Sequence, residues 1–274
     1  MDKKALLAVS FGTSYPDTRE CTIGAIERKL EERFPDREVR RAWTSSFIIR
    51  RVAKAEGLVI DTPEEAIKRL AEEGVTDLIV QPTHLSDGYE NQRMLETVRN
   101  WADRFETIRV GRPLLDTEED RDFAAQIMPR LCLGESSGKR AGRSGDKALL
   151  MMGHGSEKYP VPVYEQLQEK INERGMDHVF VGTVEGRPSF EDAKRLLDES
   201  GYRKVVLTPL MIVAGDHARN DLAGLDSDSW KSRLECAGYR TEVIMTGMGE
   251  YPEIQEMFVR HAAEAEAVER GAEK

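Results

Sequence analysis

Two histidines in this sequence stand where buried strands are expected to end. His154 follows the apolar run Leu149–Met152 inside Gly-His-Gly-Ser, and His217 lies in Val-Ala-Gly-Asp-His after a second apolar run. A short apolar run that ends at glycine predicts a buried parallel strand, and ligands bind at the carboxyl ends of such strands. Taken alone, His154 is more readily interpreted as an ordinary loop residue. For His217 that interpretation and a functional one are equally good.

Two glutamates at equivalent places strengthen the functional interpretation. Glu185 ends the apolar segment Val181–Gly186, and Glu90 follows a Gly-containing loop. A buried carboxylate without a partner is costly to desolvate, so a glutamate at a strand end implies a partner. Imidazole and carboxylate without thiolate suit Co²⁺, Ni²⁺, Fe²⁺ or Zn²⁺, and three protein ligands leave coordination positions open for reaction. The other histidines fit this site less well: we expect His84 in an apolar wall and His261 on the exposed face of a terminal helix.

An internal repeat places these residues in the fold. Lys4–Thr13 (KALLAVSFGT) matches Lys147–Ser156 (KALLMMGHGS), and residues 62–90 match residues 189–217 at constant spacing. The repeat aligns Glu90 with His217 and indicates two copies of one structural unit.

Strands alternate with helices in both copies, which predicts an α/β fold. We expect two Rossmann-like domains with parallel sheets, related by internal duplication and facing each other across a cleft. The N-terminal domain is expected over residues 1–140 and the C-terminal domain over residues 141–274, with Cys132–Lys147 as the linker. Residues 44–61 form a basic insertion in the first copy, after a strand end. A single helix is expected over residues 18–34.

The composition excludes several classes of function. With 274 residues, 39% hydrophobic and 33% charged, the chain is typical of a soluble globular protein, and its net charge of −10 argues against nucleic acid as partner. No apolar stretch approaches the roughly 18–20 residues of a membrane span, so we expect a cytoplasmic protein with no membrane partner. Neither GxxxxGK[ST] nor a GxGxxG after the first strand occurs, so no nucleotide and no organic cofactor are expected. The cysteines are few and scattered, which excludes a cysteine-based metal site.

Several segments resemble the anaerobic sirohydrochlorin cobaltochelatases, the CbiK family of class II chelatases. They are LLAVSFGTSY, DTPEEAIKRL, MGHGS, VGTVEG, and PLMIVAGDHARND followed by DSDSWKSRL, within a similarity from residue 4 to about residue 263. The resemblance implies ATP-independent insertion of Co²⁺, as substrate metal, into sirohydrochlorin, early in anaerobic cobalamin biosynthesis. It places the family's metal-binding histidines at His154 and His217 and its strand-end glutamate at Glu185. Glu90 is the nearest counterpart of a further family glutamate.

The chemistry of metal insertion assigns expected roles. We expect His154 to accept a pyrrole proton, His217 and Glu185 to hold the ion with it, and Glu90 to assist in deprotonation or metal delivery. Sirohydrochlorin is a polycarboxylate, so an acidic protein must supply local positive charge and an apolar wall. The expected contacts of the tetrapyrrole are Phe11, Tyr15, Arg50, Arg51 and Arg219. For any one of these arginines, a solvated basic face is the commoner interpretation.

Two alternatives stay open at this point. Ligand type does not separate Co²⁺ from the Fe²⁺ of a siroheme ferrochelatase or from Ni²⁺ on the same tetrapyrrole. Two similar α/β domains also suit a carrier of tetrapyrrole or metal without turnover. Exposed helix faces would permit a homo-oligomer.

Overall fold

The computed structural model describes residues 3–134 and 147–268, which form two compact units. One unit combines the chain up to Leu114 with the chain from Gly249 onward, and the other spans Leu115–Met248. This division differs from the boundary predicted after residue 140. The difference arises because α6 (Glu118–Leu133) packs against α7 (Val163–Glu173) and β5 (Lys147–Gly155). By contrast, α10 (Pro252–Ala263) packs against α2 (Ile23–Arg33) and β3 (Val75–Pro82). Most of the predicted linker lies outside the described residues.

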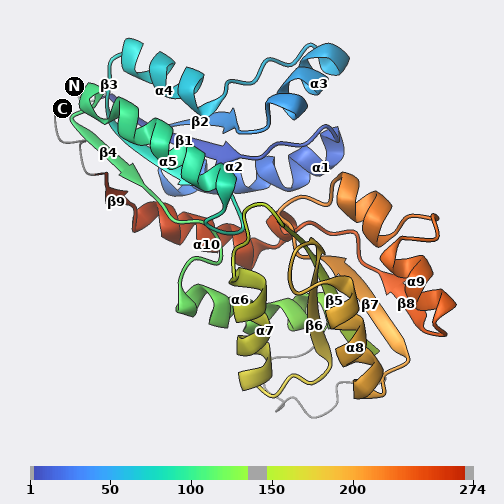
Figure 1. Ribbon diagram of the computed structural model, residues 1–274. Coiled ribbons are helices and arrows are strands. Elements are labelled where there is room, and N and C mark those ends of the chain that lie inside the picture. The colour runs from blue at the N-terminus through green and yellow to red at the C-terminus, as the bar shows by residue number, and fades with distance from the viewer. Residues whose placement is uncertain (1–2, 135–146, 269–274) are drawn as a thin grey trace. The chain divides into compact units, whose positions relative to one another are not determined.

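The first unit is built on a sheet with the strand order β2-β1-β3-β4-β9 (Figure 1). Its first four strands are parallel, and the two-residue β9 is antiparallel to β4. The strands are β1 (Lys3–Ser10), β2 (Glu38–Trp43), β3 (Val75–Pro82), β4 (Thr107–Val110) and β9 (Glu266–Ala267). The helices, besides α10, are α1 (Pro16–Cys21), α2 (Ile23–Arg33), α3 (Ser46–Glu56), α4 (Pro63–Glu72), α5 (Tyr89–Trp101) and the 3₁₀ turn η1 (Ala102–Arg104).

The second unit holds a parallel sheet with the strand order β6-β5-β7-β8. The strands are β5 (Lys147–Gly155), β6 (Val179–Glu185), β7 (Lys204–Pro209) and β8 (Arg240–Val243). The helices, besides α6, are α7 (Val163–Glu173), α8 (Phe190–Ser200), the π-helical turn η2 (Ala218–Leu222) and α9 (Trp230–Cys236). The 3₁₀ turn η3 (Met248–Glu250) begins at the last residue of this unit.

The two units share their strand order and the way in which equivalent helices begin and end, which confirms the duplication. In both sheets the first strand of the unit lies between its second and third strands. Thr62 and Ser189 each form a capping box with the carboxylate three residues later, at the starts of α4 and α8. Both helices are followed by a glycine at φ +80°, Gly74 and Gly201. The predicted α/β fold with parallel sheets is therefore correct.

The single helix expected over residues 18–34 is wrong, because the chain breaks it at Thr22. The Thr22 hydroxyl donates to the Thr18 carbonyl at 2.5 Å, and Thr22, with the distorted helical dihedrals φ −111° and ψ −79°, separates α1 from α2. A hydroxyl that bonds back to the carbonyl four residues earlier bends or weakens a helix. The basic insertion forms α3, which begins after the cap Ser45 and ends before Gly57.

Each sheet carries its own core. The central strands β1 and β5 are buried along their apolar runs, Ala5–Val9 and Ala148–Met152, as expected of parallel strands covered on both faces. Over residues 3–134 and 147–268, no helix is long and apolar enough to cross a membrane.

Candidate functional site

His154 is held between two glycines whose neighbours leave no room for a side chain. A Cβ on Gly153 would lie 2.2 Å from the Tyr164 ring, and one on Gly155 would lie 1.7 Å from the Glu185 carbonyl oxygen. Gly155 also has φ +72°, which L side chains rarely adopt. The Gly-His-Gly motif thus lets β5 pass close to α7 and β6 while the imidazole of His154 is exposed at the strand end.

His217 is oriented by a carboxylate one helical turn away. It directly precedes η2, and its Nδ1 lies 2.5 Å from Oδ2 of Asp221. π-helical turns often occur at functional sites. The sequence reasoning missed Asp221, although its spacing of four residues from His217 in Asp-His-Ala-Arg-Asn-Asp is a signal for this contact.

The structure brings His154 and His217 together. Their ring centroids are 4.5 Å apart, with an angle of 85° between the planes. The Nδ1 of His154 lies 2.8 Å from the Gly155 carbonyl oxygen. Because a carbonyl and an ionised carboxylate only accept hydrogen bonds, both imidazoles donate from Nδ1 and keep the Nε2 lone pair. The Nε2 atoms of these two neighbouring rings are therefore available to a metal ion or to protons, and the contact with the Asp221 carboxylate fixes the orientation of the His217 ring.

The predicted glutamates are not part of this pair. Glu185 ends β6, next to β5, and Gly155 pairs with it in the ladder. Within the described part of the chain, no three His, Cys, Asp or Glu side chains are grouped so that they could hold a metal ion. The structure thus joins two of the three predicted ligands, and the role of Glu185 stays a prediction. Glu90 lies in the first turn of α5, half-buried.

The residues predicted to contact a tetrapyrrole are mostly accessible. Phe11, at the end of β1, is 50% exposed, and Arg50 and Arg51 are exposed on α3. Tyr15, which precedes α1, is half-buried, and Arg219 is exposed in η2.

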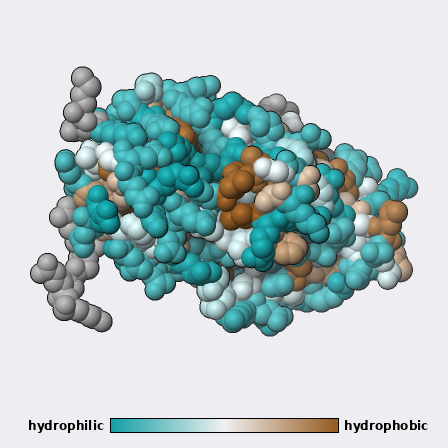
Figure 2. All heavy atoms as spheres, turned by 90° about the horizontal axis from the view of Figure 1, so that it is seen from above, coloured by the Kyte–Doolittle hydropathy of each residue, from teal (hydrophilic) through white to brown (hydrophobic). Residues whose placement is uncertain are grey.

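The sequence reasoning missed Phe47, which is 61% exposed in the first turn of α3. The backbone N–H of Ser45 donates to the Phe11 carbonyl at 3.2 Å, so the start of α3 is fixed next to Phe11. Phe11 follows β1 and Phe47 lies in the helix after β2, so both phenylalanines are exposed near the carboxyl ends of neighbouring strands, on a surface that is mainly hydrophilic in Figure 2.

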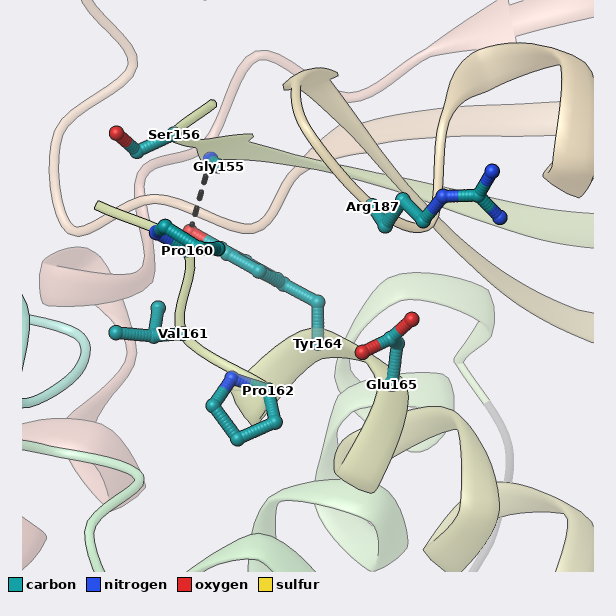
Figure 3. Close-up of a pocket in the computed structure, with 8 residues that line it drawn as sticks. All are labelled: Gly155, Ser156, Pro160, Val161, Pro162, Tyr164, Glu165 and Arg187. Carbon is teal, nitrogen blue, oxygen red and sulfur yellow. Dashed lines mark hydrogen bonds between the residues drawn. The ribbon is translucent and has the colours of Figure 1, made fainter. Parts of the chain in front are cut away.

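A small pocket of about 180 Å³ is lined in part by Gly155, the residue that follows His154 (Figure 3). Its wall runs from Gly155 past the apolar segment Pro160–Pro162 to Tyr164, whose hydroxyl accepts from the Gly155 N–H at 3.4 Å. Burial raises the pKa of Tyr164, so this hydroxyl stays protonated. Pockets for drug-sized ligands measure about 300–1,000 Å³, so this pocket is too small to enclose a ligand of that size.

Comparison with known proteins identifies the family. The sequence model of the cobalt chelatase (CbiK) family matches residues 4–267. The chain belongs to the cobalt chelatase (CbiK) family. It is 38% identical over 267 residues to the sirohydrochlorin cobaltochelatase of Salmonella typhimurium, with 96% of each chain covered. It is 33% identical over 268 residues to the sirohydrochlorin cobaltochelatase CbiKC of Nitratidesulfovibrio vulgaris, covering 97% of this chain and 91% of that protein.

Solved structures support the fold of this cobalt chelatase family member. SirB from Bacillus subtilis with Fe³⁺ has a TM-score of 0.62 at 13% identity, covering 96% of this chain and 95% of that one. SirB from Bacillus subtilis subspecies spizizenii in complex with cobalt has a TM-score of 0.59 at 14% identity, covering 96% and 94%. At such low identities the similarity shows the shared fold alone.

Asp221 provides the first test of the histidine pair in this cobalt chelatase family member. We expect Asp221→Asn to weaken Co²⁺ binding by about 10- to 100-fold, because a neutral amide supports the Nδ1–H of His217 less well than a carboxylate. Calorimetric titration with Co²⁺ measures the change. Asp228→Asn is the matched control, since it removes the same charge from an exposed position in the following loop. Equal affinities for the two variants would contradict the orienting role of Asp221.

His261 is not on the exposed face where it was predicted. It is fully buried in α10, and its Nδ1 lies 3.2 Å from the Arg112 carbonyl oxygen. The reason is that α10 packs against α2 and β3, so the terminal helix belongs to the core of the first unit.

His84 is buried, as predicted for a wall residue, and its burial has a measurable consequence. Desolvation lowers the pKa of His84 from 6.5 to about 4. The unfolded chain therefore takes up this proton first as the pH falls, and the protein loses stability between about pH 6.5 and pH 4. The loss from this one group amounts to about 3 kcal/mol. We expect the free energy of unfolding of His84→Leu, measured with urea and relative to that of the wild type, to increase by about 3 kcal/mol as the pH falls from 7 to 4. A difference between the two proteins that does not depend on pH would contradict a neutral buried imidazole.

Proposed function

We propose that this protein inserts Co²⁺ into sirohydrochlorin, without ATP, as an early step of anaerobic cobalamin biosynthesis in the cytoplasm. The observation that carries the proposal is the His154–His217 pair, with both Nδ1 atoms engaged by acceptors and both Nε2 atoms open. The related proteins of Salmonella typhimurium and Nitratidesulfovibrio vulgaris bear the name of this activity. Neither a nucleotide nor an organic cofactor has a part in the proposed reaction.

The histidine pair suits the proton balance of metal insertion. When Co²⁺ enters the macrocycle, two pyrrole N–H groups each lose a proton. Each imidazole that releases the metal recovers an Nε2 lone pair, so two vacated nitrogens can accept two protons. We propose His154 as the first proton acceptor, with His217 and the carboxylate of Glu185 holding the ion. Glu90 is the proposed assistant in deprotonation.

The first unit supplies features that suit a flat polycarboxylate. Phe11 and Phe47 offer aromatic surface at the ends of neighbouring elements, on which a macrocycle can stack. Arg50 and Arg51 follow Phe47 by three and four positions on α3, so all three lie on one face of the helix. We propose this face of α3, with Phe11, as a contact surface of sirohydrochlorin, with Tyr15 and Arg219 as further contacts.

The decisive experiment is a metal-competition insertion assay. Purified protein is mixed with excess sirohydrochlorin and Co²⁺, Fe²⁺ or Ni²⁺, without ATP, and the spectrum of the metallated product is followed. We expect many turnovers per protein with Co²⁺. A product yield that stops at one equivalent per protein would show that the protein is a carrier and not an enzyme. Faster turnover with Fe²⁺ or Ni²⁺ would show that this ion, and not Co²⁺, is the preferred substrate metal. Light scattering on the same sample tests the predicted homo-oligomer.

A further inference from the structure

The helix α3, which carries proposed contacts of sirohydrochlorin, is attached to the first unit by few apolar side chains. Of its eleven residues, Ile48 and Val52 are buried. Its start is held by a backbone hydrogen bond, in which the Ser45 N–H donates to the Phe11 carbonyl at 3.2 Å. A segment with few buried apolar contacts has low local stability, so the other end of α3 depends on a further contact.

That contact is an ion pair with a buried arginine of α1. Arg19 donates from Nη1 to Oε1 of Glu56 at 3.2 Å and from Nη2 to Oε2 at 2.6 Å, which is the fork geometry of a bidentate pair. Glu56 is the last residue of α3, and its side chain is 28% exposed, whereas that of Arg19 is 11% exposed. The hydrogen bond from Arg19 lowers the pKa of Glu56, so the carboxylate is ionised at neutral pH. The pair therefore ties the carboxyl end of α3 to α1.

Arg19 is in turn placed by Trp43, a core residue next to the Phe11 segment. The guanidinium carbon of Arg19 lies 6.0 Å from the ring centroid of Trp43, within the range of a cation–π contact. Trp43 is fully buried at the end of β2, and a Cβ on Gly12 would lie 2.8 Å from its ring, so Gly12 packs directly on it. Gly12 follows Phe11 in the chain. One tryptophan thus contacts both the backbone next to Phe11 and the arginine that holds α3.

The helical positions separate an anchoring face of α3 from an exposed face. Ile48, Val52 and Glu56 follow one another at intervals of four residues, so the ion pair continues the buried stripe of the helix. With about 100° between successive residues, Phe47 and Arg50 point away from that stripe, and both are exposed. A swing of the carboxyl end of α3 would therefore move the exposed face.

We propose that Arg19 is a positioning residue for sirohydrochlorin binding, because it fixes the direction in which α3 presents Phe47 and Arg50. The inference rests on the proposed function, in which this face of α3 contacts the tetrapyrrole. An ion pair largely withdrawn from solvent adds little net stability, and its best-attested use is to fix one arrangement of the elements that it joins. The pair thus acts on substrate affinity and leaves the chemistry of the histidine pair, in the other unit, unchanged.

The test is Arg19→Gln, which keeps a polar side chain and removes the bidentate fork. We expect KM for sirohydrochlorin to rise about 10-fold, equivalent to about 1.4 kcal/mol, while kcat changes less than twofold. The affinity for Co²⁺, measured by calorimetry, should stay at the wild-type value. Hydrogen exchange of the α3 amides should become faster, because the helix opens locally when its carboxyl end is released. In a Phe47→Ala background, Arg19→Gln should raise KM by a smaller factor, since both changes act on one face of α3.

Glu56→Gln is the second variant, because it breaks the same pair from the more exposed side. It should raise KM in the same direction. Arg174→Gln is the matched control, since Arg174 forms a similar bidentate pair with Asp122, between the end of α7 and α6 in the other unit. We expect this control to keep the wild-type KM and kcat, with a loss of melting temperature comparable to that of Arg19→Gln.

Three outcomes are distinguishable in this set of variants. An unchanged KM in Arg19→Gln and Glu56→Gln, with an active wild type, would overturn the inference and leave the proposed function intact. A KM that rises equally in Arg174→Gln would overturn it as well, because the effect would then follow stability alone. A wild type that does not insert cobalt would instead refute the proposed function.

Discussion

Replacing His154 with alanine is expected to abolish cobalt insertion, with a fall in turnover of about 10²- to 10⁴-fold. The imidazole is one of two with an open Nε2, so its loss removes both a ligand of the ion and an acceptor for a pyrrole proton. Because the side chain is exposed, the free energy of unfolding should change by less than about 0.5 kcal/mol. His217→Ala should lower turnover to a similar extent.

Two measurements separate loss of chemistry from loss of structure. Steady-state insertion of Co²⁺ reports turnover, and calorimetric titration without sirohydrochlorin reports metal binding. Glu157→Ala serves as the control, since Glu157 is exposed three residues after His154 in the same loop. We expect this control to keep wild-type turnover and metal affinity. Turnover near the wild-type level in His154→Ala would refute the assignment of this histidine.

Local patterns in the sequence predicted the parts of the fold that local physics determines. The hydroxyl and carboxylate at the starts of α4 and α8 predicted both capping boxes, and the apolar runs predicted β1 and β5. The repeat predicted two copies of one structural unit, and the two sheets indeed place their first strand between the second and the third. The position of His154 at the end of β5 followed from the same patterns, whereas His217 lies in the loop after β7, directly before η2.

Long-range packing determined the parts that were missed. The assignment of α10 to the first unit depends on contacts with β3, far away in the sequence, and β9 pairs with β4 over only two residues. The burial of His261 could have been predicted from the sequence, since His261 lies on the same helical face as Ile254 and Phe258. The contact of His217 with Asp221 could likewise have been predicted from their spacing of four residues. By contrast, nothing local in the sequence indicates that both nitrogens of His84 lack partners, because that follows from what the surrounding chain fails to provide.

Gly155→Ala is expected to be the most damaging small substitution near the histidine pair. The added Cβ would lie 1.7 Å from the Glu185 carbonyl oxygen and 2.8 Å from Cβ of Thr183, so β5 and β6 must separate. The left-handed conformation at φ +72° adds to this steric cost. Together these effects should lower the free energy of unfolding by about 3 kcal/mol or more. Cobalt insertion should fall even in the folded fraction, since His154 precedes the site of the clash.

Gly201→Ala isolates the steric part of this effect. Gly201 has φ +80°, yet a Cβ there would meet nothing within 4 Å, so only the conformational cost of about 1–2 kcal/mol applies. Urea unfolding of both variants, followed by circular dichroism, measures the difference. We expect Gly155→Ala to be clearly less stable than Gly201→Ala and the latter to insert cobalt at the wild-type rate. Equal stability of the two variants would mean that β5 and β6 do not approach as closely at Gly155 as the structure shows, and the fixed direction of His154 would lose its physical basis.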